Sequence, residues 1–172
     1  FSAIVFCPVL AVFLSVFFFD ILLLSLIFTC LRNLVPQIDR HALVRHSVKR
    51  MYDLVNAVER YPNWFAWCAG AEIIEQSETM MLAKLELRVA GIKSSFTTRN
   101  TLSPTHKISM KLEEGGFKYL TGEWIFHALS EDACKVSLHL DFEASSLLSP
   151  AFALGFRGLA DKMVDDFCRQ AD

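Results

Sequence analysis

Alternating apolar and polar positions between residues 134 and 144 give the clearest structural pattern in the chain. In the stretch CKVSLHLDFEA every second residue is apolar, namely Cys134, Val136, Leu138, Leu140, Phe142 and Ala144. Such alternation predicts a β-strand with one buried and one exposed face. After Ser149 the apolar residues change to helical spacing and share one stripe: Phe152, Phe156, Leu159, Met163 and Phe167. The pattern predicts a sheet whose apolar face is covered by a long helix.

The same alternation recurs upstream and predicts further strands at residues 37–44, 71–76, 80–89, 94–102, 107–112 and 117–128. Short turns separate most of them, so neighbouring strands are expected to be antiparallel, because parallel neighbours need long crossovers. Ser47 is the expected N-cap of a helix that stops at Tyr61-Pro62, and YPNWFAWC at 61–68 predicts a second short helix. Glycines at 155 and 158 would let the last helix approach the sheet closely or leave room.

We therefore expect an α+β fold in which six or seven antiparallel strands curve around a long C-terminal helix, with one or two short helices after the first strand. A sheet of this size tends to curl, and one helix does not fill its concave side, so a cavity is expected between them. The expected lining consists of Trp64, Phe65, Trp67, Phe96, Trp124, Phe126, Leu138, Phe142, Phe152, Phe156, Leu159 and Met163. The aromatic residues of YPNWFAWC are open to a second interpretation, as a plug of the core.

The first 34 residues stand apart in composition. The whole chain is 53% hydrophobic with a mean hydropathy of +0.34, and residues 1–31 carry a single charge, Asp20. A bilayer core needs about 20 apolar residues, so this segment is long enough for a membrane anchor, which would make a membrane a partner. The chain begins with Phe, and the segment lacks the flanks of a secretory signal. We expect residues 1–34 to be an upstream extension absent from the working protein, with Val35 as an alternative start and residues 35–172 as the folded domain.

Charge and cysteine content narrow the possible functions. With 17 basic and 19 acidic residues the net charge is −2, whereas a nonspecific nucleic-acid binder has a strongly basic face, so any RNA contact must be local. The best candidates for such a contact are Lys93, Arg99, Lys107, Lys111 and Lys118. A solubilising sheet face is the alternative explanation. Five cysteines without a CxxC pair indicate neither a zinc site nor a disulfide framework, which fits a reducing cytoplasm.

No motif for a nucleophile, a metal site or a phosphate-binding loop is present, so we predict no catalytic residues, no metal and no resident cofactor. Strand pairing would place Glu123 opposite His139, where an exposed ion pair is expected. Asp161, Asp165 and Asp166 are expected on a solvated helix face.

Five blocks of the sequence resemble the ribosome association toxin family: PQIDRHALV (36–44), MYDLVNAVERYPNWFAWC (51–68), AGIKSSFTTRN (90–100), FKYLTGEWIF (117–126) and CKVSLHLDFE (134–143). The resemblance covers essentially all of residues 36–169. The wider group is the START-like, helix-grip superfamily, which includes coenzyme Q-binding proteins and polyketide cyclases. The resemblance implies a START-like domain at residues 35–172.

This resemblance also implies a function. The chain is expected to be a cytoplasmic toxin of a toxin–antitoxin system that binds the large ribosomal subunit, prevents its association with the small subunit and so inhibits translation initiation. The alternative is a carrier or chaperone for a quinone or isoprenoid lipid that supports respiration. Besides the large subunit, an antitoxin protein and a hydrophobic ligand such as a bound quinone or lipid remain open as partners. A cyclase-type enzyme is disfavoured, because the inward positions lack suitable polar groups.

Overall fold

The computed structural model describes residues 37–172, so the predictions for residues 1–34 lie outside the described part of the chain. Seven strands form one antiparallel sheet, which confirms the predicted fold class. They are β1 (Gln37–Val44), β2 (Cys68–Gln76), β3 (Met80–Val89), β4 (Ile92–Ser103), β5 (Lys107–Gly115), β6 (Phe117–Ala128) and β7 (Cys134–Ala144). The helices are α2 (Val48–Asn56), the 3-10 turn η1 (Val58–Arg60), α3 (Tyr61–Trp64) and α4 (Pro150–Ala171).

The strands follow the order β1-β7-β6-β5-β4-β3-β2, so every neighbour except the β1–β7 pair is joined by a hairpin. β1 lies against β7 over its whole length, from Gln37 opposite Asp141 to Val44 opposite Cys134. Between β3 and β4 the chain reverses through Ala90 (φ 50°) and Gly91 (φ 77°). Two successive residues with positive φ match the twist of a hairpin, which explains the glycine at this turn.

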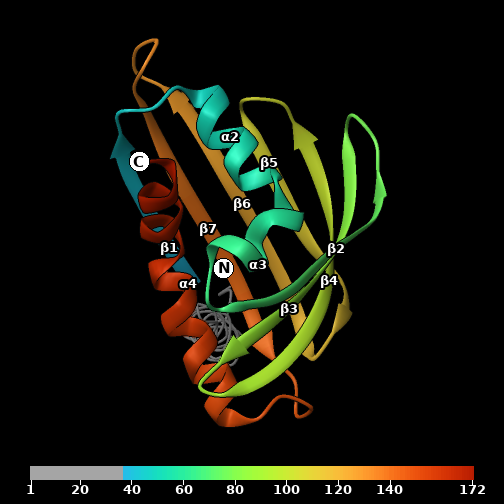
Figure 1. The fold of residues 1–172 in the computed structure, drawn as a ribbon. Helices are drawn as coiled ribbons and strands as arrows, with labels where there is room; N and C mark the ends of the chain where they lie inside the picture. The colour runs from blue at the N-terminus through green and yellow to red at the C-terminus, as the bar shows by residue number, and fades with distance from the viewer. Residues whose placement is uncertain (1–36) are drawn as a thin grey trace, which may run out of the picture. The chain divides into compact units, whose positions relative to one another are not determined.

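All helices cover one face of the curved sheet, with α4 running along it and α2 and α3 beside α4 (Figure 1). Serines cap the two longer helices, and the cap at Ser47 was predicted. The Ser47 hydroxyl accepts a hydrogen bond from the Arg50 backbone N–H at 3.3 Å, and the Ser149 hydroxyl accepts one from Phe152 at 3.1 Å. The prediction that the first helix continues to Tyr61-Pro62 was wrong, because Ala57 leaves the helical conformation and the 3-10 turn intervenes.

The buried stripe of α4 forms the centre of the core. Its fully buried side chains recur at intervals of three or four residues: Phe152, Phe156, Ala160, Val164, Phe167 and Ala171. Leu159 and Met163 flank this stripe and are partly buried. Gly155 lies so close to Val89 of β3 that an added Cβ would approach the valine methyl to less than 3.0 Å, whereas nothing lies within 4 Å of the same atom at Gly158. α4 therefore approaches the sheet closely at Gly155 and not at Gly158.

Within residues 37–172, no helix has the combination of length and apolar character that crossing a membrane requires. Cys68, Cys134 and Cys168 are free thiols. Burial raises the pKa of the Cys68 thiol to about 11, so this thiol stays protonated at neutral pH.

Candidate functional site

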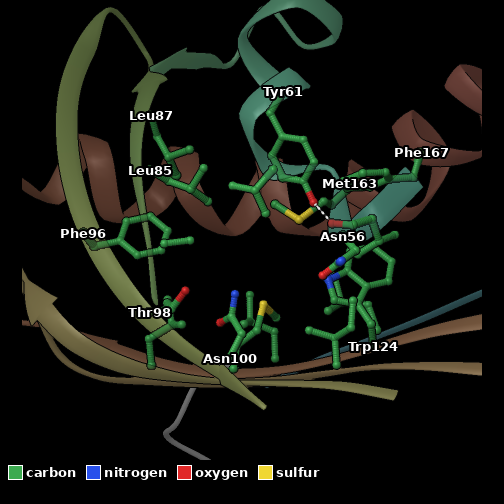
Figure 2. Close-up of a pocket in the computed structure, with 18 of the residues that line it drawn as sticks. Asn56, Tyr61, Leu85, Leu87, Phe96, Thr98, Asn100, Trp124, Met163 and Phe167 are labelled. Atoms are coloured by element: carbon green, nitrogen blue, oxygen red, sulfur yellow. Dashed lines mark hydrogen bonds between the residues drawn. The ribbon is translucent and has the colours of Figure 1, made fainter. Parts of the chain in front are cut away.

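A cavity lies between the sheet and the helices and leaves about 70 Å³ for the centres of water-sized molecules. Figure 2 shows side chains converging on this space from the sheet below and from α4 and the 56–67 segment above. The lining residues come from β3 to β7, from α4, from the end of α2 and from the segment between α2 and β2. The cavity is where the sequence analysis expected it, on the concave side of the sheet.

Apolar and aromatic side chains make up most of the cavity wall. They include Leu85, Leu87, Phe96, Ile108, Met110, Leu120, Trp124, Leu138, Leu140, Phe156, Met163 and Phe167. Within residues 37–172, no aspartate, glutamate, histidine, lysine or arginine lines it. A wall of this kind favours a neutral, largely apolar molecule, because a buried charge without a partner is costly.

Three side chains add polarity to the wall. Thr98 and Asn100 reach into the space from β4, and Asn56 reaches in from the end of α2 (Figure 2). Thr98 and Asn100 are 4% and 5% exposed. The Oδ1 atom of Asn100 has no hydrogen-bond partner, whereas buried amide oxygens in proteins are normally paired.

Two further polar groups at the cavity are already bonded within the protein. The buried Tyr61 hydroxyl donates to the Val55 carbonyl, which ties α3 to the last turn of α2, and burial raises the pKa of Tyr61 far above its usual value. The Trp67 indole N–H donates to Asp166 of α4 at 3.0 Å. Asp166 is therefore a partly buried anchor for Trp67, and its expected place on a solvated helix face was wrong.

The structure places the predicted lining residues in two groups. Those whose side chains do line the cavity are Trp67, Phe96, Trp124, Leu138, Phe156 and Met163. Those that lie elsewhere are Trp64, Phe65, Phe126, Phe142, Phe152 and Leu159. Members of the second group pack against other rings: Phe126 meets Tyr52 edge-on, Phe65 stacks on Trp67, and Phe142 and Phe152 contact Phe156. These side chains belong to the core around the cavity, because neighbouring rings cover them.

Sequence reasoning missed the polar residues Asn56, Thr98 and Asn100. A signal existed for two of them, because Phe96, Thr98 and Asn100 share one parity of a strand whose phenylalanine was expected to point inward. No periodicity marks Asn56, which ends α2 where that helix was expected to continue.

The five basic residues predicted to contact RNA are at least partly exposed, and four of them form ion pairs. The pairs are Lys93–Glu86 at 2.8 Å, Arg99–Glu113 at 3.1 Å, Lys107–Glu123 at 3.0 Å and Lys118–Glu143. For Lys111 the described residues supply no such partner. Ion pairs therefore neutralise four of the five basic side chains. Lys111 is the least neutralised of the five candidates for contact with RNA.

Glu123 does lie opposite His139, but the expected ion pair between them was wrong. Glu123 instead accepts hydrogen bonds from Lys107 at 3.0 Å and from Ser109 at 3.1 Å, and His139 pairs with Asp39 of β1. The hydrogen bond from Lys107 is the main cause of a lowered Glu123 pKa. In the described part of the chain, no three histidine, cysteine, aspartate or glutamate side chains come together as metal ligands would.

A curved antiparallel sheet that grips a long C-terminal helix, with an apolar cavity between them, defines the START-like or helix-grip class of proteins. The model of the family described as polyketide cyclase / dehydrase and lipid transport matches residues 44–168. The chain belongs to this family.

Similar proteins place the chain more narrowly within the family. It is 46% identical to the ribosome association toxin RatA of Vibrio cholerae over 80% of this chain and 96% of that protein. It is 27% identical to the mitochondrial coenzyme Q-binding protein COQ10 homolog B of Xenopus laevis over 73% of this chain and 53% of that protein. Among solved structures, the Zhui aromatase/cyclase from Streptomyces matches with a TM-score of 0.68 at 19% identity, over 80% of this chain and 93% of the enzyme. This last likeness concerns the fold alone.

Proposed function

We propose that this chain is a noncatalytic toxin that binds the large ribosomal subunit and prevents it from joining the small subunit. The observation that carries the proposal is the 46% identity to a protein named ribosome association toxin, which extends over 96% of that relative. A ribosome-binding protein acts in the cytoplasm, which the free thiols also fit.

The exposed side of the sheet is our candidate for the docking surface. Contacts to ribosomal RNA use phosphates, which favour basic side chains. Arg99 and Lys111 are opposite each other on β4 and β5, so their positive charges form one local patch despite the acidic balance of the whole chain. Arg99 must exchange its partner Glu113 for a phosphate, whereas Lys111 has no ion-pair partner within residues 37–172 to exchange.

Cosedimentation with purified ribosomal subunits tests this proposal. We expect the protein to pellet with large and not with small subunits, and to slow subunit joining measured by light scattering. With two phosphate contacts, affinity should fall about tenfold between roughly 50 and 200 mM salt. Replacing both Arg99→Glu and Lys111→Glu should abolish most of the binding.

A charge exchange within one ion pair serves as the control. The double variant Arg99→Glu, Glu113→Arg keeps the pair and the net charge but moves the positive charge to another position on the sheet. If Arg99 meets a phosphate, this variant binds weakly although it folds normally. The opposite result would be subunit binding that does not depend on salt, persists in all these variants and is lost in Phe156→Asp. That result would refute docking through the exposed side of the sheet and assign it to α4 and the cavity mouth.

A second candidate function is favoured by the cavity itself. We propose that the cavity holds a neutral hydrophobic ligand of the quinone or isoprenoid type, a proposal supported by the apolar wall and by the relative named as a coenzyme Q-binding protein. Trp67 and Trp124 line the cavity, so a bound quinone should quench tryptophan emission saturably. Phe156→Asp should remove this quenching, because it places a charge in an apolar site, whereas Phe156→Leu should keep it. Unsaturable quenching of the native protein would contradict ligand binding.

A further inference from the structure

Asn100 is the feature of the cavity that apolar packing does not explain. Its Oδ1 atom is the one fully buried side-chain oxygen or nitrogen among residues 37–172 that lacks a hydrogen-bond partner. An unpaired buried amide destabilises a fold, and an apolar side chain of similar shape would avoid that cost. An amide in this position therefore indicates that the cavity receives a molecule with a group to pair with it.

The surroundings of Asn100 define the chemistry of that group. An amide carries both a donor and an acceptor, and a hydroxyl group can serve either one. Thr98 lies two residues away on the same face of β4 (Figure 2). Met110 is opposite Asn100 on β5. None of the described residues that line the cavity is charged, so a carboxylate or phosphate would be buried among them without a counter-charge. The partner of Asn100 is therefore a neutral hydroxyl group.

The size and walls of the cavity define the rest of the molecule. A volume of about 70 Å³ for the centres of water-sized molecules indicates a small ligand of one or two rings. Phe96, Trp124 and Phe156 supply aromatic walls. We propose that the cavity binds a neutral one- or two-ring compound whose hydroxyl group hydrogen-bonds to Asn100. This inference rests on the ligand-binding candidate above and narrows it to a ligand that carries a hydroxyl group, as the reduced form of a quinone does.

Calorimetric titration with matched probes tests the inference. 2-Naphthol and 2-methylnaphthalene have nearly the same shape and differ in the hydroxyl group, and 2-naphthoate adds a charge. The measured quantity is the preference for 2-naphthol, which is the Kd of 2-methylnaphthalene divided by the Kd of 2-naphthol. It is compared between the native protein and Asn100→Leu. We expect this preference to fall about tenfold in the variant, because the hydrogen bond to the amide is lost. 2-Naphthoate should bind at least tenfold more weakly than 2-naphthol.

Two further variants make the test decisive. Leu159→Met changes a partly buried core residue that does not line the cavity and leaves the amide untouched, so the preference of this variant for 2-naphthol should stay within about twofold of the native value. Asn100→Ala removes the amide without adding volume and should lose the preference as Asn100→Leu does. An unchanged preference in both Asn100 variants would overturn hydroxyl recognition while ligand binding stands. Failure of the native protein to bind either neutral probe would overturn ligand binding and hydroxyl recognition together.

Discussion

The two glycines of α4 offer a matched pair for testing how closely this helix packs on the sheet. Glycine in a helix interior costs about 1 kcal/mol relative to alanine. At Gly158 nothing lies within 4 Å of an added Cβ, so Gly158→Ala should raise the free energy of unfolding by about 1 kcal/mol. At Gly155 the same gain in stability is opposed by a clash, because an added Cβ would lie less than 3.0 Å from a methyl carbon of Val89.

The magnitude of that clash follows from the surroundings of Val89. This residue is 6% exposed, ends β3 and pairs with Ile92, so its backbone is held by the sheet. Its β-branched side chain has little rotamer freedom with which to move aside. Overpacking of a tight core costs about 1–3 kcal/mol, so Gly155→Ala should be neutral or destabilising by up to about 2 kcal/mol.

Urea unfolding followed by far-UV circular dichroism measures both variants on one scale. In a Val89→Ala background the cost of Gly155→Ala should shrink, because the opposing methyl groups are gone, and the double-mutant cycle isolates that coupling. Gly158→Ala should show no coupling to Val89→Ala, since nothing near it changes. Equal stabilisation by both alanines would show that α4 does not approach β3 as described.

Two other predictions follow from the described residues. A chain that starts at Val35 should fold with the full helix and strand content by circular dichroism, because all seven described strands and α4 lie within residues 37–172; aggregation of this chain would argue that residues 1–34 are part of the working protein. The second concerns acid. The hydrogen bond from Lys107 lowers the Glu123 pKa below the usual 4.5, so the resulting stabilisation is present above that pH and is lost as pH falls through the folded-state pKa. Glu123→Gln should therefore flatten the fall of the urea midpoint below about pH 4.5, and a slope identical to that of the native protein would show that the pair contributes nothing.

Strand positions were predictable where alternation is long and regular. The bounds of β1, β3, β6 and β7 match their predicted ranges residue for residue, because two-residue periodicity over eight or more positions leaves little freedom. β5 was expected to end at Leu112 before a Glu-Glu-Gly-Gly turn, yet it runs to Gly115. Glu114 pairs with Thr97 of β4, so cross-strand pairing overrides the local turn preference of this segment.

The composition of the cavity wall was less predictable than its existence. Parity tells which face of a strand a side chain occupies, but not which inward side chains are covered by others. Trp124 and Phe126 were expected at successive inward positions of one strand, yet Tyr52 covers Phe126 while Trp124 reaches the cavity. The ion pairs on the exposed side depend on strand register, which shifts by a bulge between Thr97 and Thr98. No local pattern indicated that shift.

The pairing of β1 with β7 determines when this protein can complete its fold. Asp39 and His139 are 100 residues apart in the chain yet bond across the two strands, and β7 is the one neighbour of β1 among the strands of residues 37–172. During synthesis β1 therefore stays without its partner strand until β7, near the end of the domain, has been made. Closing so long a loop carries an entropic cost before any contact repays it, which slows folding. The complete sheet, with α4 packed on it, should therefore form only after the chain has left the ribosome that made it.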